Sequence, residues 1–433
     1  MSVVQFSLNR MLAVFGVRAA CLVRAKMLAG RDAHSDAFPL FALAARDGLP
    51  EGCYRLGRCY LLGLGVPPSI GEALRWLRRA AEAGEMAAQT QLGALALQGV
   101  TDQGGGGLFD TGCRDPDYER AEHWCRLAVA AGSAEAKALL AFILTAGPLD
   151  RRDQAAGERL YLEAAEAGWS RGQLGLATTL LGQGGREAAE QAVALLRAAA
   201  ADGVAVAHHL LGMLAESGAA GAVDFGAAAS SYRDAADLGY APAQARYGFA
   251  LLHGRGIARD LFTAETWLRR AALAGDAQAA AVVGYLYVRN GALPPNYTEA
   301  ATWLRRAAEA GHTGAARTLG RMLLLGSGVP RDVAEGALWL RVAADAGEAT
   351  ARGDLARLAL TGQVGEDDRR AVAGWLREDA AAGDPAAQFD FGLCLAQGVG
   401  IEPDLFAALD WMRRAADGGH SEAMRMLAEL VEP

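Results

Sequence analysis

Lysine is almost missing from this sequence: it occurs only at Lys26 and Lys137, although the 433 residues include 42 basic ones. Arginine fills the other basic positions, a bias typical of a GC-rich bacterial genome. The net charge is −8, and because five basic residues precede the first acidic one, Asp32, the rest of the chain carries −13. Nucleic-acid binders show the opposite excess, so we expect no nucleic-acid partner.

Long apolar runs are missing too, since no stretch reaches the ~18 uninterrupted residues that a membrane-spanning helix requires. The short run at residues 11–17 is followed by Arg18, where a signal peptidase requires a small residue, so we expect no cleaved secretion signal. Arg18 also occupies the aliphatic position of a lipidation motif before Cys21. Six cysteines are too few for a disulfide framework, which favours the cytoplasm of a bacterium.

Catalytic motifs are absent as well: there is no Walker loop, no His-Glu-x-x-His and no nucleophile elbow. The glycine-rich "GQGG" at residues 182–185 lacks a lysine and follows a predicted helix instead of a strand. Cys113, His123 and Cys125 have a spacing that matches no common zinc site. The sequence therefore predicts a protein that is not an enzyme, with no catalytic residue, no cofactor and no metal.

Glycine, by contrast, is abundant and regularly placed, with 54 in the chain. Short motifs such as "LRRAAEAG" end on glycines that recur every 36 residues, except for steps of 48 before Gly132 and 35 before Gly203. The set comprises Gly48, Gly84, Gly132, Gly168, Gly203, Gly239, Gly275, Gly311, Gly347, Gly383 and Gly419. Such a period is typical of a helical repeat protein, in which each glycine ends a helix in the left-handed conformation.

Tryptophan lies eight residues before most of these glycines, and a small pair such as Ala80 and Ala81 follows it on the same helical face. This tryptophan column consists of Trp76, Trp124, Trp267, Trp303, Trp339, Trp375 and Trp411, and its exceptions are Leu40, Leu160, Leu195 and Ser231. The first half of each repeat carries apolar residues at helical spacing, and a Gly-x-Gly-Val turn follows it. Each repeat is predicted to be a helical hairpin that stacks on its neighbours.

The stretch "YRLGRCYLLGLGVPPSIGEALRWLRRAAEAG" at residues 54–84 resembles the Sel-one-like repeat (SLR) family, a relative of the tetratricopeptide (TPR) repeat. The resemblance implies an all-α fold, a right-handed superhelical α-solenoid of about eleven repeats of 36 residues. We expect a basic N-terminal leader at 1–13, a degenerate first repeat at 14–48, ten repeats at 49–419 and a capping helix at 420–433. An insertion at about 101–116 separates two of the helices. Repeats that end at Gly168, Gly203 and Gly239 depart from the family pattern.

Three positions of each first helix, spaced i, i+3 and i+7, vary freely between repeats, so they are not expected to pack on a neighbour. In TPR-like solenoids the first helices line the concave surface, so the resemblance implies that this stripe faces a groove. Arginine and aromatic residues are typical interface anchors. The predicted partner-binding residues of the stripe are Arg55, Arg58, Arg246, Phe249, Tyr285, Arg289, Arg321 and Arg357. Phe109 in the insertion and Trp169 outside the tryptophan column are secondary candidates.

The predicted function is that of a protein-protein interaction adaptor or scaffold, which binds a protein or extended peptide with acidic residues. The family implies a role in bacterial signalling or in an envelope or secretion-related complex, without choosing among them. A second interpretation is a membrane- or envelope-associated regulator that is tethered peripherally by its basic N-terminal helix. Oligomeric state and partner identity are not determined by the sequence.

Overall fold

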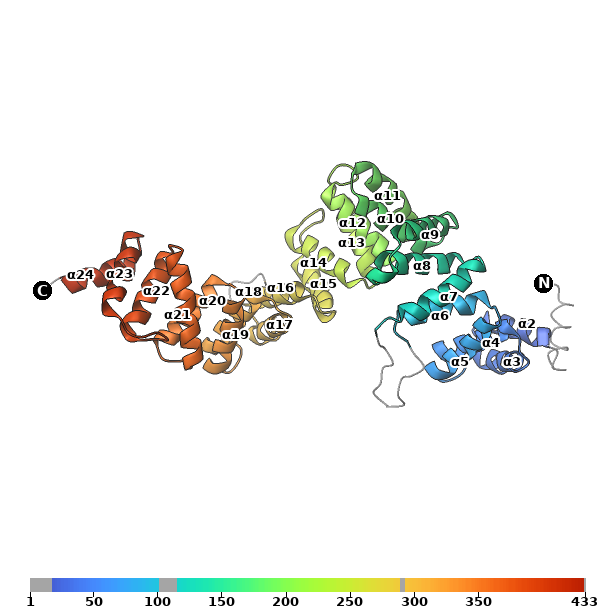
Figure 1. Ribbon diagram of the computed structural model, residues 1–433, viewed down its shortest axis with the longest axis horizontal. Helices are drawn as coiled ribbons and strands as arrows, with labels where there is room; N and C mark the ends of the chain where they lie inside the picture. Colours follow the sequence, from blue (N-terminus) through green and yellow to red (C-terminus); the bar gives the residue numbers. More distant parts are fainter. Residues whose placement is uncertain (1–17, 101–114, 289–292, 432–433) are drawn as a thin grey trace. The chain divides into compact units, whose positions relative to one another are not determined.

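The computed structural model describes residues 18–100, 115–288 and 293–431, and helices of 11 to 16 residues form almost all of its regular structure (Figure 1). Clustering of contacts divides the chain into two units, Met1–Val223 and Asp224–Pro433. The boundary falls inside the repeat that ends at Gly239. We describe each unit on its own.

The first unit contains α2 (Arg18–Ala29), α3 (His34–Arg46), α4 (Pro50–Leu62), α5 (Ile70–Glu82), α6 (Met86–Leu97), α7 (Tyr118–Ala130), α8 (Ala134–Ala146), the 3-10 helix η1 (Leu149–Arg151), α9 (Gln154–Glu166), α10 (Ser170–Gln183), α11 (Arg186–Ala201) and α12 (Ala205–Ser217). The second unit contains α13 (Phe225–Asp237), α14 (Ala241–His253), α15 (Leu261–Leu273), α16 (Ala277–Tyr287), α17 (Tyr297–Glu309), α18 (Thr313–Leu325), α19 (Val333–Asp345), α20 (Ala349–Leu360), α21 (Glu366–Ala381), α22 (Pro385–Gln397), α23 (Leu405–Asp417) and α24 (Ser421–Val431). No strand occurs within the described ranges. The predicted all-α class is confirmed.

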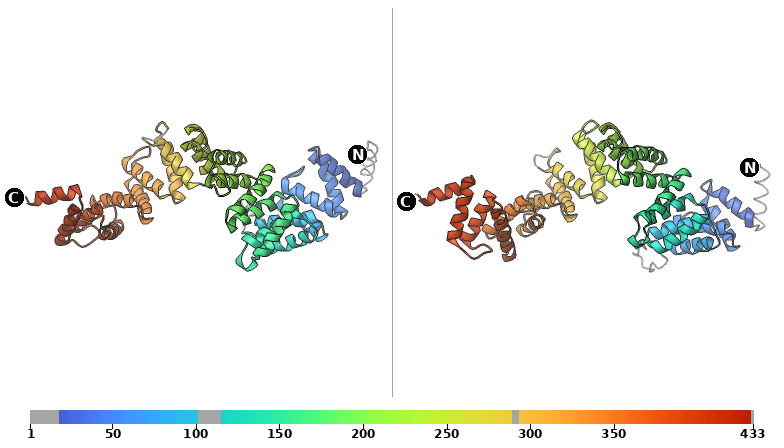
Figure 2. Two further views of the ribbon diagram at one scale, coloured as in Figure 1. Left: turned by 90° about the horizontal axis from the view of Figure 1, so that it is seen from above. Right: turned by 45° about the horizontal axis from the view of Figure 1, so that its top comes forward.

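Even-numbered helices from α4 onward are the first helices of the repeats, and the odd-numbered helices that follow them are the second helices (Figure 2). Most second helices begin at a side chain that accepts a hydrogen bond from a backbone N–H of the first turn, as Asp332 does from Glu335 at 2.9 Å, whereas α11 and α21 begin after a glycine. They end where the predicted glycine column lies, and every glycine of that column has a positive φ, between 76° and 103°. The predicted helix ends are therefore confirmed.

The two helices of a hairpin approach most closely where a first-helix glycine meets the leucine that follows the tryptophan. A methyl group added to Gly57 would lie 2.8 Å from Leu77 Cγ, and one added to Gly284 would lie 2.7 Å from Leu304 Cγ. Leu77, Leu268, Leu304 and Leu340 are all fully buried, with 0% exposure. Glycine is needed in these first helices because the facing leucine occupies the space of a side chain.

A second glycine contact lies between neighbouring repeats. Gly328, in the Gly-x-Gly-Val turn before α19, has a φ of 76°, and a methyl group there would lie 2.2 Å from Tyr297 Cβ on α17 of the preceding repeat. Gly256 meets the backbone of Phe225 in the same way. The turn glycine therefore has two requirements, a left-handed backbone and close contact with the previous repeat.

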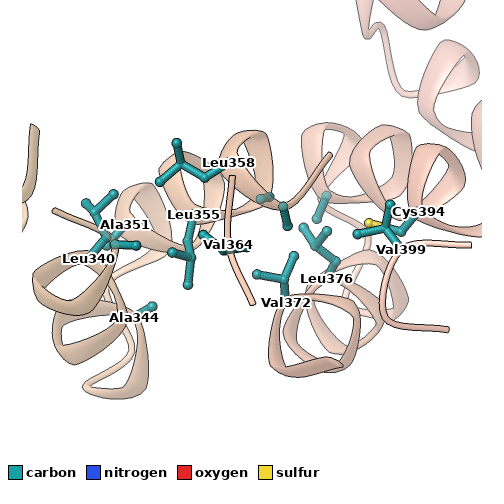
Figure 3. Packing of buried hydrophobic residues seen from close by; sticks show 14 of the residues in the cluster. Leu340, Ala344, Ala351, Leu355, Leu358, Val364, Val372, Leu376, Cys394 and Val399 are labelled. Carbon is teal, nitrogen blue, oxygen red and sulfur yellow. The ribbon is translucent and has the colours of Figure 1, made fainter. Parts of the chain in front are cut away.

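Clusters of buried apolar side chains extend over several successive repeats within each unit. Figure 3 shows Leu340 of α19, Leu355 of α20, Leu376 of α21 and Cys394 of α22 within one cluster. Each helix contributes to contacts on both sides, as expected for a solenoid in which a repeat packs on its neighbours.

The tryptophan column is less buried than the fully enclosed leucines beside it. Trp303 is 6% exposed, while the other tryptophans of the column are half-buried. The Trp303 indole N–H donates to Glu299 Oε1 at 2.7 Å, and Arg269 of the preceding repeat pairs with the same oxygen at 2.6 Å. The Arg269 guanidinium also lies 5.1 Å from the Trp303 ring centroid. Trp303, Glu299 and Arg269 thus link two repeats along their second helices.

We expect Gly284→Ala to lower the free energy of unfolding by about 1 to 3 kcal/mol, because the added methyl group overpacks the contact with Leu304. The matched control is Gly374→Ala in α21, where a methyl group meets nothing within 4 Å. This control should be neutral or stabilising, since alanine favours a helix. Urea denaturation measures both variants. Equal destabilisation by the two substitutions would contradict the packing argument.

We expect Trp303→Ala to lower the free energy of unfolding by about 3 to 5 kcal/mol, because the substitution removes a large buried ring. In a solenoid the loss should remain local, since stability depends on contacts between neighbouring repeats. Hydrogen exchange should therefore rise in α15 to α19 and much less in α22 and α23. A uniform rise over the whole second unit, or no change, would argue against stacking of this kind.

Candidate partner-binding face

First helices lie closer together than second helices within each unit. The pairs α6 and α8, α8 and α10, α16 and α18, and α20 and α22 are in contact. In the described part of the chain, no two successive second helices make a comparable contact. Each stack therefore curves toward its first helices, which places them on its inner side.

One residue of each first helix, the ninth, forms a column along this inner face. We call it the ninth-position column. In the first unit it contains Arg58, Ala94, Phe142, Thr178 and Met213, and in the second unit Phe249, Tyr285, Arg321, Arg357 and Leu393. Phe142 is 44% exposed and Met213 is 41% exposed, so both present apolar surface to solvent. The sequence analysis missed these two residues, although their register with Arg58 and Phe249 would have revealed them.

The face is hollowed around Phe142. A pocket of about 480 Å³ lies between the ends of α8 and α10 and the start of α9, and Phe142, Tyr161 and Thr178 line it. Gly182, the first residue of the "GQGG" stretch, lies in the last turn of α10 and is also part of the wall.

The part of the inner face that α2 and α4 form is basic. Arg55 and Arg58, both on α4, line a second pocket of about 390 Å³ together with Lys26 of α2. Glu51 lies beside them, 2.7 Å from Lys26 Nζ and 3.5 Å from Arg55 Nη2. The structure therefore brings two of the predicted site residues together in one cavity and adds Lys26, which the sequence analysis did not select.

In the second unit the charges of the stripe are mixed. Arg321 Nε and Arg357 Nη2 lie 3.9 Å and 3.5 Å from the carboxylate of Asp354, whose side chain is only 13% exposed. Asp390 occupies the equivalent position one repeat further on, and burial raises the pKa of its carboxyl group. Arg321 and Arg357 are exposed, as predicted for binding residues, but they share an acidic neighbour.

The remaining stripe residues have differing environments. Arg246 is exposed, whereas Phe249 and Tyr285 are half-buried and pack against the core of the second unit. The Tyr285 ring lies 6.4 Å from His312, and burial raises the pKa of the Tyr285 hydroxyl. These two rings present one edge to the inner face.

Two predicted residues cannot be placed. Arg289 of the stripe and the secondary candidate Phe109 lie outside the described residues. Trp169 precedes α10, is half-buried, and its indole N–H is buried without an acceptor among the described residues. Its role as a partner anchor stays a prediction.

The cysteines of the described ranges are all buried, and no disulfide joins any two of them: Cys21, Cys53, Cys59, Cys125 and Cys394. Burial raises the pKa of Cys125 and of Cys394 to about 12. Cys125 packs against Gly93, where a methyl group would lie 2.6 Å from its Sγ. Within the described ranges no group of three or more His, Cys, Asp or Glu side chains is arranged to hold a metal, and Cys113 lies outside these ranges.

Helical hairpins that stack on their neighbours and share buried apolar clusters define an all-α solenoid of repeats. The model of the Sel1 repeat matches eight segments, at residues 50–85, 106–133, 134–169, 170–204, 241–276, 277–312, 314–348 and 385–420. These segments cover more than half of the chain, which therefore belongs to the Sel1 repeat family, as predicted. Two of the matched segments end beside Gly168 and Gly203, although the column position of the tryptophan holds Leu160 and Leu195 in them.

Solved Sel1 repeat proteins are similar to this chain. The crystal structure of c5321, a protective antigen of uropathogenic Escherichia coli strains with an SLR fold, has a TM-score of 0.65 and 26% identity, covering 91% of this chain and 82% of that one. A Sel1 repeat protein of Oxalobacter formigenes has a TM-score of 0.49 and 26% identity, covering 73% of this chain and 89% of that one. The likeness to c5321 agrees with the family assignment.

A curated relative from Neisseria meningitidis, the uncharacterized protein NMB1327, is 34% identical over 142 residues, which are 33% of this chain. The match spans only 27% of that protein's length. Among the described residues, no helix is both long and apolar enough to cross a membrane.

We expect Cys125 and Cys394 to resist alkylation in the folded protein at pH 8. With a pKa of about 12, only roughly one thiol in ten thousand is ionised at that pH, and the thiolate is the reactive form. Iodoacetamide labelling mapped by mass spectrometry should modify both residues only after unfolding in guanidinium chloride. Rapid labelling of either residue in the native protein would contradict the packing described above.

Proposed function

We propose that this chain is a non-catalytic adaptor that binds an extended segment of a partner protein along the inner face of its first helices. The observation that carries the proposal is the ninth-position column, which lines up exposed apolar and cationic side chains on one face. Sel1 repeat solenoids bind proteins and are generally non-catalytic scaffolds, which supports the same function.

Apolar contact would come from the middle of the first unit's column. Phe142 and Met213 are 44% and 41% exposed, and large apolar side chains at such exposure are typical interface anchors. Methionine adapts its shape to different partners. The pocket beside Phe142 has the size of a few side chains, so it suits one anchor residue of an extended segment.

Charge favours an acidic partner at one part of the face only. Lys26, Arg55 and Arg58 outnumber Glu51 in the first unit, whereas Arg321 and Arg357 share Asp354 in the second. We therefore propose that acidic residues of the partner contact the first unit, and that a segment of mixed charge contacts the second. A nucleic acid would be repelled by the net charge of −8.

The cellular setting belongs to the proposal as well. We place the protein in the bacterial cytoplasm, within a signalling, envelope or secretion-related complex. The alternative is peripheral attachment to the membrane through the basic segment at residues 1–13. Cell fractionation distinguishes the two, because attachment through charge should be released by high salt.

The test replaces the two exposed anchors, Phe142 and Met213, with aspartate. The matched control replaces Phe406 and Leu338, which are 89% and 59% exposed on second helices. Affinity capture from lysate, followed by quantitative mass spectrometry, should show at least a tenfold loss of specific partners for the first variant, since two anchors contribute about 2 kcal/mol or more together. The control should retain them. Equal capture by both variants, at matched folding, would rule out the inner face as the binding surface.

A further inference from the structure

We propose that the pocket formed by Lys26, Arg55 and Arg58 binds a carboxylate of the partner segment, next to an apolar residue of that segment. This inference rests on the proposed function and assigns one end of the inner face a ligand chemistry. The pocket has a volume of about 390 Å³, and α2, α3, α4 and the turn after α4 supply its walls.

The pocket has an excess of positive charge. None of the residues that line it is acidic. Glu51 is the carboxylate beside it, and it contacts both Lys26 and Arg55. Three cationic side chains therefore face one carboxylate, and a second carboxylate would bring the cluster closer to neutrality.

Arg55 has an unused donor at this place. Its Nε–H is buried and has no acceptor among the described residues, and a buried donor without an acceptor is unfavourable. The contact of Arg55 with Glu51 is long, at 3.5 Å, and the side chain is 36% exposed, so the guanidinium can reorient. A ligand carboxylate can then accept from Nε and Nη together, which is the geometry that arginine provides best.

Tyr54 holds the two guanidinium groups near each other before any ligand arrives. The Arg55 and Arg58 guanidinium carbons each lie 5.9 Å from the centre of the Tyr54 ring. Cation–π attraction of this kind favours guanidinium positions close to the ring, so both groups stay beside the pocket while they adjust to a ligand.

The apolar part of the pocket distinguishes a peptide carboxylate from a free inorganic anion. Phe41, Ala29 and Leu64 give the wall an apolar part, and Gly30, His34 and Cys59 complete the lining. An aliphatic side chain adjacent to the carboxylate would cover the apolar part, and its removal from water favours binding. Inorganic phosphate offers no such group. The carboxylate itself can be a chain terminus or an Asp or Glu side chain.

The experiment measures fluorescence anisotropy of four fluorescein-labelled peptides, Gly-Ser-Gly-Glu-X-Glu-X with X as Leu, Val, Ile or Phe, on the full chain at 50 mM salt. Each peptide is also made with an amidated C-terminus, with Gln in place of Glu, and with both changes. At least one acidic peptide should bind the wild type saturably. Loss on amidation identifies a terminal carboxylate as the ligand, and loss on Glu-to-Gln replacement identifies a side-chain carboxylate.

The variants Arg55→Gln and Arg58→Gln should each weaken binding about tenfold or more. The controls Arg197→Gln and Arg413→Gln remove equal charge from exposed positions on second helices and should change the dissociation constant less than twofold. Glu51→Gln should strengthen binding several-fold, since the competing carboxylate is gone. A purely structural role of Arg55 would not produce this gain. Circular dichroism at matched temperature confirms folding of every variant.

Three results would overturn the inference: no saturable binding of any acidic peptide to the wild type, equal binding of the peptides that carry neither carboxylate, or displacement by inorganic phosphate as effective as by unlabelled peptide. The capture experiment with the Phe142 and Met213 variant tests the inner face separately. Partner loss in that experiment, with no peptide binding here, would leave the adaptor function in place and remove only the carboxylate site.

Discussion

The architecture depends on one recurring contact, the approach of a first-helix glycine to a second-helix leucine. At Gly284 and Leu304 the space for a methyl group is already occupied by the leucine side chain. The same contact recurs at Gly57, Gly248 and Gly320, in both units. Because a side chain at these glycines would push the helices apart, the contact determines how closely these four hairpins pack.

This close packing explains where the tryptophan lies. Since the leucine takes the enclosed position, the neighbouring indole lies along the second helix on the side of the preceding repeat. There it meets a glutamate and an arginine, as at Trp303, Glu299 and Arg269. The hydrogen bond from Trp303 and the charge of Arg269 hold the pKa of Glu299 below its usual value, so the carboxylate stays ionised. Long polar side chains therefore bridge the second helices, which stand further apart than the first.

First helices lie closer together than second helices, and this difference in spacing produces the candidate binding face. First helices approach one another directly, so their exposed ninth residues form a compact column, with Phe142 and Met213 in the first unit and Arg321 and Arg357 in the second. A face of this kind suits an extended segment, because each repeat offers one contact at a regular interval. At one end of the face, the pocket of Lys26, Arg55 and Arg58 adds a preference for negative charge.

The sequence by itself determined the repeat, its helices and their ends, because a periodic glycine with a positive φ and a periodic apolar stripe have a direct local meaning. It also gave the register of the stripe, which includes Arg55, Arg58 and Phe249. Only the tertiary structure decided which charged side chains of the stripe remain available to a binding partner. Lys26 joins Arg55 from a different repeat, and Asp354 lies beside both Arg321 and Arg357. Such pairings depend on the distance between helices, and a one-dimensional pattern contains no such distance.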